Sequence, residues 1–214
     1  MRDADADEVP ATPDEEAAGV FPRHAASLIV LRVTRGGPEM LMGMRGARHK
    51  FMPNRLVFPG GAVDPEDIHA EVAAPLHPDS RAHLEKAADP SLAHGLGVAA
   101  ARELEEESGL TLGAPALLDG LDFLCRMVTP PNNAMRFNAR FLVIDADRVS
   151  GTIAGSGELE ALRYYPIEEA LALDLALPTR QVLQRLRPWL AMSAEERLAR
   201  RRTPVYDRRT WSLE

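Results

Sequence analysis

Apolar and polar residues follow two different periods along this chain, and the changes between them predict its strands and helices. Residues 24–33 and 40–45 are apolar runs rich in β-branched or long side chains, and residues 35–38 between them have turn composition, which predicts a hairpin. Residues 56–58 form a short strand pattern that Pro59-Gly60-Gly61 should end. Further strands are expected at residues 117–128, 136–144 and 159–165.

A long helical pattern follows Ser91, which can cap an N-terminus, and Gly109 stands where a left-handed residue would end the helix. Gly95 and Gly97 weaken the first turns, so the firm part of the helix is expected from Val98. Strands and helices interleave, which predicts an α/β fold with a mixed sheet between helices. The other expected helices lie at residues 167–173 and 179–190, with a short one within residues 79–88.

The chain has 214 residues, 45% of them hydrophobic, which suits one domain with tails. We expect a disordered acidic tail at residues 1–19, a domain at residues 20–192, and a basic segment at residues 193–214 that is helical and then frayed. Inside the domain, residues 62–90 have loop composition, and residues 70–88 are expected at the surface because they are rich in proline and charge.

The formal net charge of −7 argues against a nonspecific nucleic-acid binder, which needs a basic surface. No run is long and apolar enough for a membrane span, and the first residues lack the features of a signal or transit peptide, so the cytoplasm is the expected location. The single cysteine, Cys125, lies in a strand pattern and is expected in the core. The spacings of His69, His77, His83 and His94 match no compact zinc pattern, which leaves them as residues of a solvated loop.

Glu103, Glu106 and Glu107 stand at positions i, i+3 and i+4, so one face of the long helix presents three carboxylates. These carboxylates repel one another, and they lie near the helix C-terminus, where the dipole disfavours anions. A hard divalent cation would reverse both effects. Taken alone, the cluster could also be a solvated acidic face.

The context of the cluster favours a site. Arg102-Glu103-Leu104-Glu105-Glu106-Glu107-Ser108-Gly109-Leu110 resembles the second half of the Nudix box, and Phe58-Pro59-Gly60-Gly61 resembles the strand end that opens it. The resemblance implies the Nudix fold, an α/β/α sandwich, and hydrolysis of a nucleoside diphosphate linked to another moiety. It also implies that Glu103, Glu106 and Glu107 bind Mg²⁺ or Mn²⁺, and that Arg102 orients a glutamate of the same helix.

Two features depart from the box. Asp67 stands where the box has a glutamate, so the resemblance carries no role over to it, and the spacer from there to Arg102 is much longer than in the box. This insertion, at about residues 68–95, resembles the split box of the peroxisomal coenzyme A diphosphatase branch, as do Met44-Arg45 and residues 51–61. The resemblance implies coenzyme A or acyl-coenzyme A as substrate. ADP-ribose, dinucleotides, nucleotide sugars and capped RNA stay open.

A general base must reach the attacking water in such a reaction. The resemblance offers Glu103 within the box, and Glu158 and Glu160 after Gly155-Ser156-Gly157 are the candidates outside it. The side chains expected to bind substrate phosphates are Arg45, Arg55 and Arg136, together with the backbone of Gly60 and Gly61. For each of these charged residues, a polar loop or a surface salt bridge is the alternative.

The sequence therefore leaves two classes of function. The first is a diphosphatase that acts on a small nucleoside diphosphate derivative, as a monomer or a homodimer. The second is a Nudix domain that binds a ligand without turnover. The intact glutamates favour the enzyme, because a binding module has no need of them.

Overall fold

A mixed β-sheet forms the centre of the molecule, in a computed structural model that describes residues 21–46, 54–155 and 157–214. Its strands run in the order β11-β2-β1-β9-β8-β12-β13, with β3 paired to β2 and β4 paired to β1. β1 runs parallel to β9 and antiparallel to β2, as expected for a mixed sheet. The strands are β1 (Arg23–Thr34), β2 (Gly37–Arg45), β3 (Leu56–Val57), β4 (Gly60–Ala62), β8 (Asp122–Val128), β9 (Phe137–Asp145), β11 (Leu159–Pro166), β12 (Pro204–Asp207) and β13 (Thr210–Leu213).

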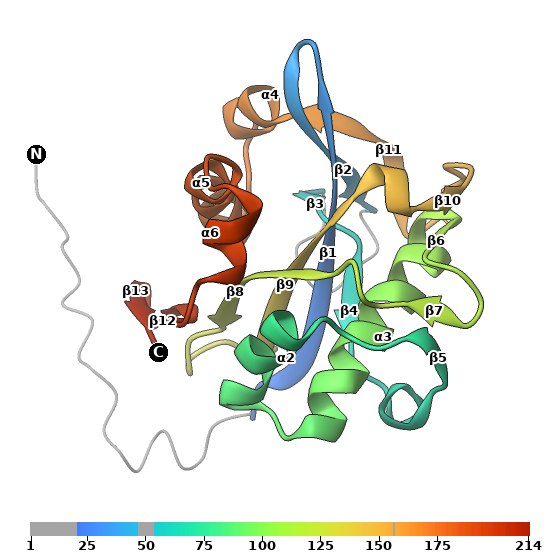
Figure 1. Ribbon diagram of the computed structural model, residues 1–214. Helices are drawn as coiled ribbons and strands as arrows, with labels where there is room; N and C mark the ends of the chain where they lie inside the picture. Colours follow the sequence, from blue (N-terminus) through green and yellow to red (C-terminus); the bar gives the residue numbers. More distant parts are fainter. Residues whose placement is uncertain (1–20, 47–53, 156) are drawn as a thin grey trace, which may run out of the picture.

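Helices cover both faces of this sheet (Figure 1), and the alternation of side chains along β1 explains why. Ala26, Leu28 and Val30 belong to one hydrophobic core, beneath α3 (Pro90–Ser108). Ile29 and Leu31 belong to a second core, beneath α5 (Leu177–Leu190). Successive residues of a strand point to opposite faces, so an uninterrupted apolar run supplies both cores. The predicted α/β/α sandwich is confirmed.

The remaining elements are short. Two pairs of strands lie outside the main sheet, β5 (Val72–Ala74) with β7 (Ala116–Leu117) and β6 (Leu110–Thr111) with β10 (Ser150–Gly151). The other helices are α2 (Pro78–Leu84), α4 (Ile167–Ala172), α6 (Ala194–Leu198) and the 3₁₀ turns η1 (Pro65–His69), η2 (Glu85–Ala87) and η3 (Ala146–Arg148).

Helix α3 begins earlier than the sequence suggested. Asp89, not Ser91, is its N-cap, and its side chain accepts a hydrogen bond from the backbone N–H of Leu92 at 2.9 Å. Gly95 and Gly97 lie within the helix because other segments approach it closely there. A Cβ at Gly95 would lie 3.1 Å from Ile68 Cγ1, and one at Gly97 would lie 3.0 Å from Leu118 Cδ1. Gly109 ends the helix with a φ of 71°, as predicted.

The insertion contributes to the core, so its expected surface location is wrong for several residues. Leu76 and Leu84 are buried in the cluster beneath α3. His83, on α2, is buried rather than solvated; its ring stacks on Phe123 with centroids 5.1 Å apart, and its Nδ1 lies 2.8 Å from the Thr203 hydroxyl. Helix α2 turns His83 and Leu84 toward the core, and Leu76 precedes the helix, so the loop-like composition concealed these contacts.

Two strand predictions also need correction, while the core position predicted for Cys125 is confirmed. The strand expected at residues 117–128 is two strands, β7 and β8, with residues 118–121 between them. Gly60 and Gly61 do more than end a strand, because they form β4, which pairs with β1 through Ser27 and Gly60.

The C-terminal segment is ordered where it was expected to fray. After α6, β12 and β13 form a hairpin, and β12 adds to the sheet parallel to β8, with Val205 opposite Arg126. The buried Thr203, which contacts His83, links this hairpin to the insertion. The first twenty residues and residues 47–53, which include part of the coenzyme A resemblance, lie outside the described residues.

Candidate metal and diphosphate site

The pairing of β4 with β1 brings Gly60 and Gly61 beside the last turns of α3. The backbone N–H of Gly60 donates a hydrogen bond to Glu107 Oε2 at 2.8 Å. Glu103 lies against the next residue, since a Cβ added to Gly61 would lie only 2.1 Å from Glu103 Oε1. The two halves of the motif, which are far apart in the sequence, therefore meet in space.

Arg102 connects the acidic residues on both sides of the insertion. Its Nε and Nη2 donate to the two carboxylate oxygens of Asp67, each at 3.0 Å. Its Nη1 donates to Glu103 Oε1 at 3.0 Å and to Glu106 Oε2 at 3.1 Å. Hydrogen bonding of the guanidinium to the accepting carboxylate of Asp67 is the largest cause of the raised pKa of Arg102. Asp67, to which the resemblance gave no role, is thus buried and positions the arginine.

Burial and like charges make this cluster electrostatically unfavourable without a cation. Glu107 is 2% exposed, and burial raises its pKa to about 7, with the charges of Glu103 and Glu158 adding to the effect. Burial also raises the pKa of Glu103, against the lowering effect of Arg102. The charge of Arg45, whose Nη2 lies 3.8 Å from Glu107 Oε1, lowers the pKa of Glu107.

The chemistry of these side chains fits a hard divalent cation, because carboxylate oxygens are its preferred ligands. As they stand, no three His, Cys, Asp or Glu side chains converge on one point within residues 21–46, 54–155 and 157–214. Arg102 explains this, since its guanidinium holds Glu103 and Glu106. For Glu103, Glu106 and Glu107 to bind one cation, Glu103 and Glu106 would have to turn away from Arg102.

The other predicted residues divide into those near the cluster and those away from it. Arg45 lies near Glu107, and the exposed Glu158 is close enough for its charge to affect both Glu103 and Glu107. Arg55 instead pairs with Asp174. Arg136 donates to the carbonyl oxygen of Thr129 at 3.1 Å. Glu160 is exposed on β11, opposite Met44.

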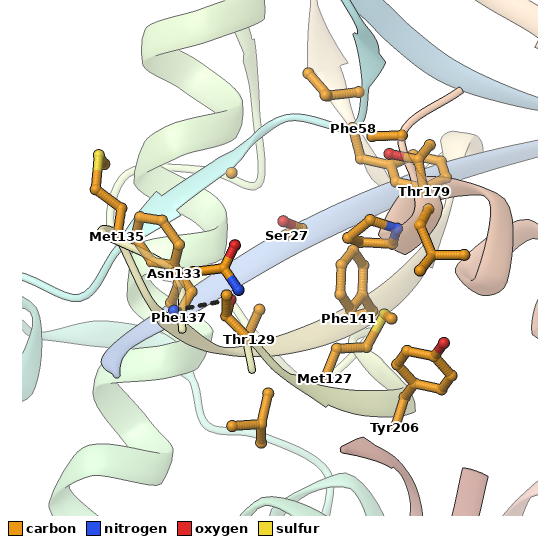
Figure 2. A pocket seen from close by; sticks show the side chains of 18 of the residues that line it. Ser27, Phe58, Met127, Thr129, Asn133, Met135, Phe137, Phe141, Thr179 and Tyr206 are labelled. Atoms are coloured by element: carbon orange, nitrogen blue, oxygen red, sulfur yellow. Dashed lines mark hydrogen bonds between the residues drawn. The ribbon is translucent and has the colours of Figure 1, made fainter. Parts of the chain in front are cut away.

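A cavity of about 620 Å³ begins at Gly60, Gly61 and Arg45 and extends over the face of the sheet toward the C-terminal hairpin. Figure 2 shows its side chains, with Phe58, Phe141 and Thr179 grouped together and Met135, Asn133 and Phe137 farther along. One wall of the cavity, formed by Met127, Tyr206 and Arg209, was not predicted from the sequence. Its only signal was the short apolar pattern around Tyr206, inside a segment dominated by arginine.

Comparison with known proteins agrees with this geometry. The family model of the NUDIX domain matches residues 95–186, which include α3 with all three glutamates. This segment is thus similar to a NUDIX domain. A curated Caenorhabditis elegans protein described as a nudix hydrolase is 28% identical over 198 residues, which are 76% of this chain and 59% of that protein. This chain thus matches less than two thirds of that relative's length. The NUDIX model ends at residue 186, before the C-terminal hairpin.

Solved structures support the NUDIX fold. A NUDIX hydrolase from Alicyclobacillus acidocaldarius aligns with a TM-score of 0.63 at 24% identity, over 85% of this chain and 97% of its own. A MutT NUDIX hydrolase from Burkholderia pseudomallei aligns with a TM-score of 0.51 at 22% identity, over 78% and 99%. In the part of the chain that the structure describes, no helix has the length and apolar character to cross a membrane.

Proposed function

We propose that this protein is a divalent-metal-dependent diphosphatase of the NUDIX type that acts on a nucleoside diphosphate derivative. The observation that carries the proposal is the meeting of Glu103 and Glu107 with Gly60 and Gly61 at one end of the cavity. Buried carboxylates with raised pKa values favour a cation, and backbone N–H groups beside an arginine favour a phosphate.

Glu103, Glu106 and Glu107 would hold Mg²⁺ or Mn²⁺. When bound, such a cation neutralises phosphate charge and increases the acidity of a water molecule. Arg45 is positioned to contact a phosphate beside Gly61, and Arg102, held by Asp67, would orient Glu103. The oxygen of water forms a bond to phosphorus, the bridging P–O bond breaks, and the leaving phosphate oxygen retains the electron pair.

We assign the general base to Glu158 rather than Glu160, with Glu103 as the alternative within the motif. Both residues are exposed, but the charge of Glu158 acts on Glu103 and Glu107, whereas Glu160 lies on β11 opposite Met44. Glu158→Gln should therefore lower kcat far more than Glu160→Gln. The kcat–pH profiles of both variants test this assignment, and an equal loss in the two would contradict it.

Coenzyme A or an acyl-coenzyme A is the proposed substrate, with 3′,5′-ADP and a phosphopantetheine as products. Two features support it: the resemblance of the segment from Met44 to Gly61, and a cavity lined by aromatic and methionine side chains that suits a nucleoside or a long apolar chain. ADP-ribose, dinucleotides and nucleotide sugars are the alternative substrates. Arg55 and Arg136, which were expected to bind substrate phosphates, do not line the cavity.

A substrate panel tests the proposal. Coenzyme A, acetyl-coenzyme A, ADP-ribose, a diadenosine polyphosphate and a nucleotide sugar are incubated with the protein and Mg²⁺ or Mn²⁺, and products are separated by chromatography. Glu103→Gln is the inactive control. Turnover of ADP-ribose or a dinucleotide about tenfold more efficiently than coenzyme A would contradict the coenzyme A assignment.

A binding module without turnover is the second candidate. The observation that favours it is the guanidinium of Arg102, which holds Glu103 and Glu106 in ion pairs. Tight binding of the panel ligands with no product, in either metal, would support this candidate. Cell fractionation and sedimentation test the cytoplasmic location and the homodimer, which stay predictions.

A further inference from the structure

The turn between β12 and β13 has a backbone conformation that its sequence does not favour. Its two central residues are Arg208 and Arg209, with φ values of 46° and 60°. A two-residue hairpin loop with positive φ at both positions strongly prefers Asn-Gly or a similar pair, because a Cβ is unfavourable there. Retained strain of this kind is common where a side chain must occupy a functional position.

The rest of the hairpin is held firmly, so it presents this turn in a fixed place. Trp211 packs against Tyr206 and donates from Nε1 to Gln181 Oε1 of α5 at 2.8 Å. Backbone hydrogen bonds of 2.7 and 2.9 Å join Thr203 and Glu214 at the open end of the hairpin. The turn is therefore an extension of the sheet and not a loose terminus.

Arg209 lies in the cavity lining, at the end formed by the hairpin. Arg23, at the start of β1, lines the same cavity. In the part of the chain that the structure describes, neither Arg209 nor Arg23 has a side-chain hydrogen bond or an ion pair. Two unpaired arginines beside one cavity are notable in a chain of net charge −7, because carboxylates are available to pair with them.

The distance of Arg23 and Arg209 from the proposed diphosphate site indicates which part of a substrate they could bind. Ser27 lies opposite Gly60, and Arg23 is four residues earlier on the same face of β1, or about 13 Å along the strand. Between the two ends, aromatic side chains such as Phe141 and Tyr206 line the cavity. The cavity thus has an anion site at Gly60 and Arg45, an apolar middle, and cationic groups at the far end.

We propose that Arg209, with Arg23 beside the same cavity, binds a further phosphate group of the substrate, beyond the diphosphate that is cleaved. This inference rests on the proposed function, which places the cleaved diphosphate at Gly60 and Gly61. It makes the substrate a nucleoside diphosphate derivative with an additional phosphate on the nucleoside. The C-terminal hairpin then contributes to substrate specificity, although it lies outside residues 95–186 that the NUDIX model matches.

A matched pair of variants tests this role. Arg209→Gly removes the side chain and relieves the positive φ, so folding should be preserved, and Arg208→Gly does the same one residue away, outside the cavity lining. Calorimetry with 3′,5′-ADP and with AMP, which lacks the second phosphate, measures the recognition without turnover. The parent should bind 3′,5′-ADP about tenfold more tightly than AMP, as expected for a charge-assisted hydrogen bond.

Arg209→Gly should abolish this preference and leave AMP binding unchanged, while Arg208→Gly keeps the preference. Arg23→Gln should reduce it. The inference is wrong if the parent shows no preference, if it binds neither nucleotide, or if both glycine variants lose the preference equally. Retained preference without hydrolysis of any panel substrate would refute the proposed hydrolysis, while the phosphate-binding role of Arg209 would still hold.

Discussion

Glu107→Gln separates the electrostatic cost of the site from its function. In the absence of metal, the carboxylate of Glu107 is 2% exposed and its pKa is raised from 4.5 to about 7, mainly by burial. In the unfolded chain the same group ionises near its ordinary value. The native state therefore holds a proton between pH 4.5 and 7 that the unfolded state has lost. The free energy of unfolding is therefore unaffected by this group below pH 4.5, and it falls as the pH rises from 4.5 through 7 and the buried carboxyl group ionises.

The size of the effect follows from the shift. At about 1.4 kcal/mol per pKa unit, the ionised carboxylate destabilises the metal-free protein by roughly 3 kcal/mol above pH 8, and by less than about 1 kcal/mol at pH 5. Glutamine does not ionise in this pH range, and its carbonyl oxygen can still accept a hydrogen bond from the N–H of Gly60. The metal-free variant should therefore gain roughly 2–3 kcal/mol on the parent between pH 5 and pH 8, or about 4–12 °C in Tm.

Thermal and urea unfolding of both proteins with chelator, at pH 5 and pH 8, measure this difference. Glu105→Gln is the control, since Glu105 is exposed on the same helix. At pH 8 with saturating Mg²⁺ or Mn²⁺ the parent should gain roughly 2.7 kcal/mol at one hundred times the dissociation constant, and the variant should lose most of this gain. A difference between parent and variant that does not change with pH would refute the reasoning and make Glu107 a structural partner of Arg45 and Gly60.

Three further predictions concern His83, Gly61 and Leu84. Burial lowers the pKa of His83 to about 4, so the protein should lose roughly 2 kcal/mol of stability between pH 7 and pH 5, and His83→Phe should remove this loss in urea titrations. Gly61→Ala places a Cβ against the carboxylate of Glu103, so kcat should fall at least about tenfold, whereas Gly36→Ala, in an open turn, should leave it unchanged. Leu84→Ala should cost about 2–5 kcal/mol in unfolding free energy, and the exposed Arg81→Ala under about 0.5 kcal/mol; equal effects would show that the insertion is not core.

The sequence predicted those parts of the fold whose signals are local. The apolar run of β1, the end of α3 at Gly109 and the i, i+3, i+4 spacing of the glutamates each depend on a few neighbouring residues. Gly95 and Gly97 led to a wrong prediction of where α3 begins. Glycine is needed at these positions because Ile68 and Leu118 approach the helix closely there, which no local pattern reveals. The hairpin after α6 was missed for a related reason, since strands of four residues gain their stability from the sheet they join.

The position of Asp67 shows why a long insertion need not disrupt such a site. Residues 68–101 separate it from Arg102 in the sequence, yet the two side chains form two hydrogen bonds of 3.0 Å. Each doubling of a loop's length costs only about 0.6 kcal/mol of closure free energy. The insertion offsets this cost by burying Leu76 and Leu84 beneath α3, where each apolar side chain contributes roughly 1.5–3 kcal/mol. Because the added residues pack on the first half of α3, the last turns with Glu103 and Glu107 keep their contacts with Gly60 and Gly61. The insertion thus lengthens the chain without displacing the carboxylates that define the site.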